Sequence, residues 1–206
     1  MSSYYLENLV EYSKKRVSMS YFPMFIDFSD KKILVVGGGN IATEKLEKLV
    51  DFTKEITVIT KELTQECHNL IKEHCLTLYQ RGYKAGDIDS FDIVIVATNT
   101  QELHKEIFEE SRSKHILVNS VDNTKYCDFI FPSYIKRDDL TIAFSTSGAS
   151  PAFAKHLRRY FENIIPDGVE EFLAKLKRLR SEMPKGKERM AYFEKLVSDY
   201  FASKFK

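Results

Sequence analysis

Two kinds of hydrophobic pattern alternate along the first part of the chain, and they predict its elements. Short apolar runs rich in β-branched residues are typical of buried strands, and apolar residues at helical spacing fill the stretches between them. The predicted strands are residues 33–36, 56–60, 75–80, 91–97 and 115–119, and the predicted helices are residues 41–50, 63–73 and 101–112. Strands that alternate with helices favour an α/β fold, here a Rossmann-like, mostly parallel sheet.

The pattern changes after residue 119. Residues 127–132 and 140–145 are strand-like and are joined by the charged link 136–139, which predicts an antiparallel pair outside the main sheet. A helix is expected from Pro151, with Ser150 as its N-cap, to about Pro166. Two further helices are expected between residue 169 and the end, with a break at residues 183–186.

These patterns divide the chain into four predicted segments. They are a helical arm (1–20), the sheet domain (21–119), a small α+β segment (120–165) and a helical end domain (166–206). Within the sheet domain, the aromatic stretch 21–28 is expected to cover one edge or face of the sheet.

The turn after the first strand carries a glycine motif typical of nucleotide-binding proteins. In residues 31–42, KKILVVGGGNIA, Gly37 and Gly39 occupy the first two glycine positions of the fingerprint and Ala42 occupies the small third position. Gly37 permits a tight turn, Gly39 lets the backbone approach a pyrophosphate, and Ala42 lets the helix pack closely on the strand. A tight turn without a ligand is the alternative, but the surrounding strand–helix alternation favours the nucleotide site.

Other strand ends are expected to complete this site. The second strand ends at Thr60, and Glu62 follows where an acidic residue that binds the ribose hydroxyls is usually found, slightly late in the sequence. The neighbouring Lys61 suits a ribose phosphate instead, so local chemistry leaves NAD and NADP open. Thr98 and Asn99 end another strand and are a candidate second wall.

Composition narrows the class of protein. The 206 residues include 31 basic and 30 acidic side chains, a net charge of +1, so no overall charge bias points to nucleic acid or a membrane. The three cysteines have no C-x-x-C spacing, which argues against disulfides and structural zinc. No signal sequence or apolar run of about 20 residues is evident, so a cytoplasmic protein is expected.

Two stretches could carry chemistry. Asp122 follows the last predicted strand of the sheet, and its carboxylate suits a general base or metal ligand; capping the turn at Asp122 is an equally weighted alternative. Residues 145–151, STSGASP, precede a basic helix, and hydroxyls beside a helix N-terminus and cations suit a polyanionic substrate. The candidate ligands are Thr146, Ser147, Ser150, Lys125, Lys136, Arg137, Lys155 and Arg158, although each cation taken alone also suits a solvated surface.

The order and spacing of several motifs resemble one family. They are YFPMFIDFSDKKILVVGGGNIATEK, ATNT, NSVD and CDFIFPSYIKRDDLTIAFSTSGASPAFAKHLRR, which together span residues 21–166. The chain resembles the precorrin-2 dehydrogenase / sirohydrochlorin ferrochelatase family, the N-terminal module of siroheme synthases. The resemblance covers only this N-terminal module, so methylation of uroporphyrinogen is not among the activities that it implies.

The resemblance implies an activity and a set of site residues. It implies NAD-dependent oxidation of precorrin-2 to sirohydrochlorin, with Fe²⁺ insertion as a second activity in some members, and a cytoplasmic homodimer formed through residues 120–165. Gly37, Gly39, Asn40, Ile41, Lys61 and Glu62 match the family's NAD contacts, Asp122 its essential carboxylate, and Thr146 a serine of its serine-rich stretch. No stable metal site is expected, only Asp122 as a transient iron ligand. A monofunctional dehydrogenase and a non-catalytic NAD-binding redox sensor remain the alternatives.

Overall fold

The computed structural model describes residues 21–204, which form two compact units, Phe22–Ile130 and residues 131–204. The predicted helical arm of residues 1–20 lies outside the described residues. Each unit has its own hydrophobic cluster, and each is described separately below.

The first unit contains a five-stranded parallel sheet, as the sequence predicted. Its strands are β1 (Ile33–Val36), β2 (Ile56–Thr60), β3 (Thr77–Gln80), β4 (Ile93–Val96) and β5 (Leu117–Ser120), in the spatial order β3-β2-β1-β4-β5. β1 pairs with both β2 and β4, so the strand that leads into the glycine turn lies at the centre of the sheet. The order reverses there, between β1 and β4, and ligands of such sheets bind at that crevice.

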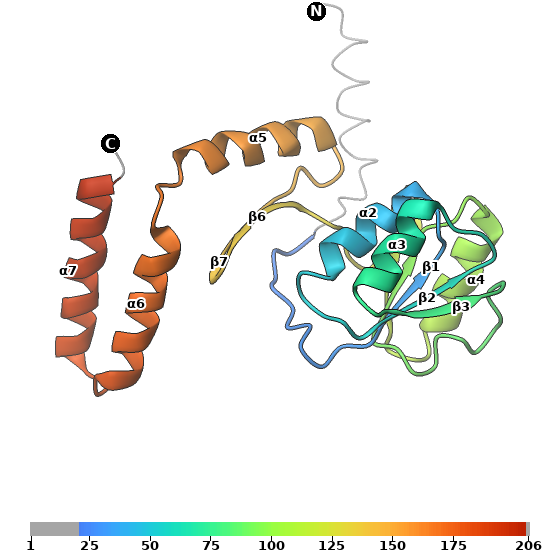
Figure 1. Cartoon of the computed structure of the whole chain (residues 1–206), viewed down its shortest axis with the longest axis horizontal. Coiled ribbons are helices and arrows are strands. Elements are labelled where there is room, and N and C mark those ends of the chain that lie inside the picture. The colour runs from blue at the N-terminus through green and yellow to red at the C-terminus, as the bar shows by residue number, and fades with distance from the viewer. Residues whose placement is uncertain (1–20, 205–206) are drawn as a thin grey trace, which may run out of the picture. The chain divides into compact units, whose positions relative to one another are not determined.

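Helices cover the two faces of this sheet (Figure 1). α2 (Asn40–Leu49) and α3 (Gln65–Glu73) lie on one side and α4 (Gln101–Ser111) lies on the other. α3 begins two residues later than predicted, because the Thr64 hydroxyl caps it by accepting a hydrogen bond from the Cys67 N–H (3.2 Å).

The core explains why β1 and β4 are apolar throughout. Successive strand residues point to opposite faces, and all four residues of each strand are buried. Leu34 and Val36 pack in a cluster with Ile107 of α4 and with Val118 of β5. Burial on both faces is the condition that gives continuous rather than alternating hydrophobic runs.

The second unit consists of one hairpin and three helices. The hairpin strands are β6 (Ser133–Arg137) and β7 (Leu140–Phe144), and the helices are α5 (Pro151–Ile164), α6 (Val169–Glu182) and α7 (Lys187–Lys204). Ser150 caps α5, since its hydroxyl accepts a hydrogen bond from the Phe153 N–H (3.2 Å), as predicted. No helix among residues 21–204 is long and apolar enough to cross a membrane.

The structure corrects the first strand of the predicted pair. Residues 127–132 are not a strand; β6 begins at Ser133, and Lys136 and Arg137 lie in it rather than in a link. Side chains hold the earlier segment against β5 instead of strand pairing. The Asp128 carboxylate accepts from the Val118 N–H (2.8 Å), and the Asn119 amide donates to the Phe129 carbonyl (2.8 Å).

The hairpin turn is therefore shorter than the sequence suggested. It consists of residues 138 and 139, and Asp138 adopts φ of +46°, a left-handed conformation that aspartate tolerates in tight turns. The aromatic stretch also differs from expectation, since the side chains of Phe22 and Phe25 are 85% and 73% exposed and do not cover the sheet. A short 3₁₀ helix, Thr124–Tyr126, follows β5.

Candidate functional site

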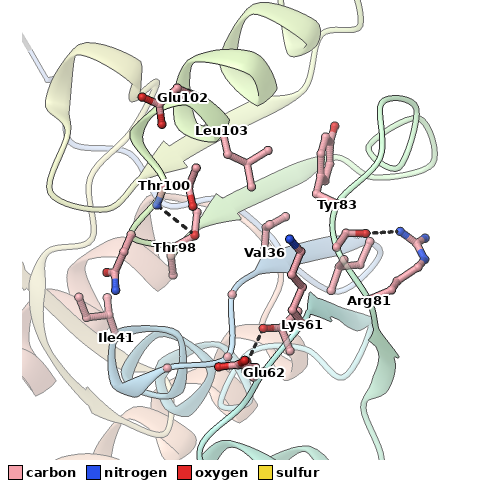
Figure 2. Close-up of a pocket in the computed structure, with 18 of the residues that line it drawn as sticks. Val36, Ile41, Lys61, Glu62, Arg81, Tyr83, Thr98, Thr100, Glu102 and Leu103 are labelled. Carbon is pink, nitrogen blue, oxygen red and sulfur yellow. Dashed lines mark hydrogen bonds between the residues drawn. The ribbon is translucent and has the colours of Figure 1, made fainter.

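A pocket of about 830 Å³ lies at the carboxyl edge of the parallel sheet. The ends of β1, β2, β3 and β4 and the first turns of α2 and α4 line it (Figure 2). All eight residues predicted to bind the cofactor line this one pocket: Gly37, Gly39, Asn40, Ile41, Lys61, Glu62, Thr98 and Asn99.

The glycine turn forms the floor of the pocket and only glycine fits two of its positions. Gly37 has φ of +131°, and a Cβ there would lie 2.1 Å from the Ala97 carbonyl oxygen of the neighbouring strand end. A Cβ at Gly38 would lie 2.6 Å from the Glu62 carbonyl oxygen. Gly38, which the sequence did not single out, therefore lets this turn pack against the chain that follows β2.

Gly39 differs from its two neighbours. Its backbone is extended (φ −83°, ψ −173°), and a Cβ there would meet nothing within 4 Å. It is the N-cap of α2 and supplies no side chain to the first backbone N–H groups of that helix. Open space beside unpaired N–H groups and the positive end of a helix dipole fits the phosphates of a dinucleotide.

Charged side chains stand at the ends of β2 and β3. Lys61 extends across Gly82, where a Cβ would lie 2.9 Å from Lys61 Cε, and the Thr60 hydroxyl donates to the Glu62 carbonyl (2.6 Å). These two contacts fix the segment that carries Lys61 and Glu62. The side chains of both residues can then face a ribose, in which Glu62 would accept hydrogen bonds from hydroxyls.

A clamp after β3 adds residues that sequence reasoning missed. Arg81 donates from Nη1 and Nη2 to the two carboxylate oxygens of Asp87 (2.6 and 2.9 Å), and this pair holds the pKa of Asp87 below its ordinary value. The bidentate pair closes the loop that follows β3 and fixes one wall of the pocket. The loop has no hydrophobic periodicity, so only its location after a strand could have indicated a role.

Tyr83 is part of the same wall. Its hydroxyl donates to Glu110 of α4 (2.6 Å), and burial followed by this bond raises the pKa of Tyr83. Glu110 also accepts from the Gly86 N–H (2.8 Å) and from Lys114 Nζ (2.8 Å). The tyrosine ring is thus fixed at the pocket, where its face can contact a planar group.

Thr98 lies on the opposite wall, between β4 and α4 (Figure 2), and Asn99 lines the same pocket. The Thr98 hydroxyl accepts from the Thr100 N–H (3.3 Å), which closes a tight turn at the end of the strand. α4 starts at Gln101, so a second helix N-terminus faces the same pocket.

Asp122 lies at the same sheet edge but does not line the pocket. The turn that carries it continues the ladder, because the Val121 N–H donates to the Val96 carbonyl (3.0 Å), and Asn123 Nδ2 donates to Gln101 of α4 (3.1 Å). Asp122 is exposed and adopts φ of +60°. Among residues 21–204 its carboxylate accepts no hydrogen bond, so the capping alternative is not found.

Lys45 on α2 lies close enough to this carboxylate to interact with it electrostatically. Partial burial lowers the pKa of Lys45, and the negative charge of Asp122 acts in the opposite direction and raises it. Sequence reasoning missed this lysine, because it belongs to a regular helix and nothing in its spacing relates it to residue 122.

The predicted substrate ligands are distributed over both units. Lys125 belongs to the first unit, where its Nζ lies 5.5 Å from the centre of the Tyr126 ring. The other seven belong to the second unit: Lys136, Arg137, Thr146, Ser147, Ser150, Lys155 and Arg158.

The structure brings the three hydroxyl residues together in one loop. The Thr146 hydroxyl donates to the Ser150 carbonyl (3.1 Å) and accepts from the Ser150 N–H (3.0 Å), and Ser147 has φ of +51° between them. The cations are less uniform. Arg158 pairs with Glu162, and Arg137 Nε lies 3.9 Å from a Glu170 oxygen, whereas the side chains of Lys136 and Lys155 are exposed.

Two regions of the chain match models of known protein families. A family model described as putative NAD(P)-binding matches residues 24–133, more than half of the chain, and a model described as sirohaem biosynthesis protein central matches residues 137–163. Siroheme synthase of Pseudoalteromonas atlantica is 38% identical over 151 residues, and that of Zymomonas mobilis subsp. mobilis is 32% identical over 190 residues.

These relatives are considerably longer than the chain. The alignments cover 73% and 90% of the chain but 33% and 40% of the two relatives. A solved structure named SirC, precorrin-2 dehydrogenase, superposes with a TM-score of 0.70 at 24% identity, covering 82% of the chain and 85% of that structure. At that identity the superposition establishes a shared fold.

Proposed function

The chain belongs to the putative NAD(P)-binding family and is a relative of the siroheme synthases, and on that premise we propose that it oxidises precorrin-2 to sirohydrochlorin with NAD⁺. The observation that carries the proposal is the convergence of four strand ends. They gather a phosphate-binding turn, a carboxylate for a ribose and a polar second wall in one pocket, next to a turn with an exposed carboxylate.

The residues of the pocket fit a nicotinamide dinucleotide. Gly39 and the N-terminus of α2 would hold the pyrophosphate, and Glu62 would accept hydrogen bonds from the adenosine ribose. We assign NAD rather than NADP, because the carboxylate of Glu62 would repel a ribose phosphate. A higher affinity for NADH than for NADPH is the expected result of a fluorescence titration.

The chemistry assigned to the chain is removal of one proton. The bound cofactor supplies the acceptor for a hydride, two electrons and one proton, from the macrocycle. A second proton must then leave the macrocycle as its conjugation extends, and the Asp122 carboxylate would take it. The side chain of Lys45 on α2 interacts electrostatically with that carboxylate.

The substrate class is a polyanion, because precorrin-2 carries eight carboxylate side chains. The hydroxyl loop of Thr146, Ser147 and Ser150, together with the exposed Lys136 and Lys155, is our candidate binding surface on the second unit. Arg137 and Arg158 are further candidates on that unit, and Lys125 is a separate candidate on the first unit. Each charge-assisted hydrogen bond to a substrate carboxylate would add affinity without a strongly basic protein overall.

We also propose a second activity, insertion of Fe²⁺ into sirohydrochlorin, and we propose that the chain forms a homodimer. The Asp122 carboxylate would act as proton acceptor or transient ligand while Fe²⁺ enters sirohydrochlorin; Fe²⁺ is a co-substrate of this step and not a resident metal. A homodimer is supported by Phe153, Tyr160 and Ile164, which are 58%, 62% and 44% exposed at spacings that lie on one face of α5. A reducing cytoplasm is proposed from the thiol content of the chain.

An anaerobic assay with precorrin-2 and NAD⁺ tests the function directly. NADH formation at 340 nm is expected in the absence of iron, and siroheme absorbance is expected after Fe²⁺ is added. NADH without siroheme would select the monofunctional dehydrogenase. NADH binding without either product would favour the redox sensor, because a nucleotide-binding sheet also serves regulators.

A further inference from the structure

A buried histidine connects the cofactor pocket with the turn that carries Asp122. His104 lies on α4 with its side chain only 1% exposed. Its Nε2 lies 2.8 Å from the Thr98 carbonyl oxygen, and its Nδ1 is in hydrogen-bond contact with the hydroxyl of Ser120, which is itself 2% exposed. We refer to these three groups as the His104 link.

The partners fix which ring nitrogen donates. A carbonyl oxygen only accepts, so Nε2 carries the proton and donates to Thr98. In the neutral ring Nδ1 is then the acceptor, and the Ser120 hydroxyl donates to it. The ring is thereby oriented from both sides, because reversing it would break both bonds.

The link begins where the sheet hydrogen bonds end. The β4–β5 register finishes at Val96 opposite Ser120, and the last bond of that kind runs from the Val121 N–H to the Val96 carbonyl (3.0 Å). Beyond this bond the segments that follow β4 and β5 diverge into different loops. On one side Thr98 lines the pocket, and on the other the Ser120 carbonyl accepts from the Asn123 N–H (3.3 Å), which closes the turn around Asp122.

We propose that His104 is a positioning residue, which sets the Asp122 turn at a fixed distance from the cofactor wall formed by Thr98. The inference rests on the proposed function, since it assigns the link a role in proton removal during oxidation. A histidine that only fills the core would stabilise the fold to the same extent, but its loss would leave turnover at saturating substrate unchanged. Measuring both turnover and stability therefore distinguishes a positioning residue from a residue that only fills the core.

The decisive comparison is between two buried serines. Ser120→Ala removes the hydroxyl that donates to His104 but leaves the bond from His104 to Thr98. Ser111→Ala is the matched control on α4: Ser111 is 1% exposed, and its hydroxyl donates to the Phe108 carbonyl (2.8 Å). The same hydroxyl accepts from Arg112 Nε (3.2 Å) and Nη2 (2.9 Å), and neither partner lines the pocket. We expect kcat for precorrin-2 oxidation to fall about tenfold in Ser120→Ala and to stay within about twofold of wild type in Ser111→Ala.

Cofactor affinity provides the second readout. The NADH dissociation constant should stay within about twofold in Ser120→Ala, because Thr98 keeps its partner, and should rise about fivefold in His104→Leu, which leaves the Thr98 carbonyl unpaired. His104→Gln carries one donor and one acceptor and should recover most of both losses. If the leucine variant does not fold, Ser120→Ala alone decides the proposal.

Failure of the link differs from failure of the proposed function. A kcat for Ser120→Ala within twofold of wild type would overturn the positioning role. If wild-type protein forms no NADH from precorrin-2, the proposed function fails, and hydrogen exchange at the Asn123 amide then tests the link. At least about tenfold faster exchange in Ser120→Ala than in Ser111→Ala supports it, and equal exchange refutes it.

Discussion

Gly39→Ala is expected to weaken cofactor binding strongly while it changes the stability of the fold only slightly. In the free protein a Cβ at residue 39 meets nothing within 4 Å, and φ of −83° with ψ of −173° suits alanine. Gly39 is the N-cap of α2, where alanine is somewhat less favourable than glycine, but alanine also reduces the entropy of the unfolded chain. The free energy of unfolding should therefore change by less than about 1 kcal/mol.

Cofactor binding should respond much more strongly. The added methyl group would occupy the space in which we place the pyrophosphate, and displacing the phosphate would lengthen its bonds to the first N–H groups of α2. One hydrogen bond to a charged group contributes about 1.5–3 kcal/mol. Its loss corresponds to a rise of about 10- to 150-fold in the NADH dissociation constant.

Fluorescence titration with NADH and denaturant unfolding measure the two effects on the same sample. Gly186→Ala is the matched control, since Gly186 also precedes a helix and a Cβ there also meets nothing within 4 Å. Gly37→Ala provides the opposite limit, because its Cβ would lie 2.1 Å from the Ala97 carbonyl oxygen and should impair folding itself. If Gly39→Ala bound NADH as tightly as wild type, the pyrophosphate would not lie against this turn.

Three other substitutions test separate parts of the account. Asp122→Asn should keep the NADH dissociation constant within about twofold but lower kcat for precorrin-2 oxidation at least about 100-fold, because an amide cannot take the proton; stopped-flow NADH formation measures this. Glu62→Gln should lower the preference for NADH over NADPH about tenfold in paired titrations, and an unchanged ratio would show that Glu62 does not face the ribose. The lowered pKa of Asp87, caused first by the bond from Arg81, stabilises the fold fully above about pH 4, the ordinary value, and this contribution disappears as the pH falls through the lowered folded-state value. Acid unfolding of Asp87→Asn should therefore be less pH-dependent than that of wild type below about pH 4, and coincident acid curves would contradict the assignment.

The parallel sheet was predictable because its strands are buried on both faces. β1 and β4 have uninterrupted apolar runs. The glycine motif identifies the turn after β1, because few other turns require glycine at these positions. The ends of the strands then located the pocket, since parallel strands bring their carboxyl ends to one edge. This is why Lys61 and Thr98, distant in sequence, could be expected at one site.

Residues that act through tertiary contacts left no such pattern. The segment 127–132 has the composition of a strand, but Cys127 and Asp128 bond to the backbone of β5 and hold it in an irregular path. The spacing around His104 indicates no partner, because one partner, Thr98, lies in the loop after β4 and the other, Ser120, lies at the end of β5. The role of Arg81 is evident only from its bond to Asp87, and the loop that carries both residues has no hydrophobic periodicity.

The stoichiometry of precorrin-2 oxidation by NAD⁺ tests the proposed activity most directly. Purified protein is mixed anaerobically with excess NAD⁺ and a known amount of precorrin-2, and NADH and sirohydrochlorin are followed together, with Asp122→Asn in parallel. We expect the wild-type protein to form one NADH for each sirohydrochlorin and the variant to form almost no NADH. Bound NADH with no oxidation by wild type, or equal rates for the two proteins, would contradict this expectation.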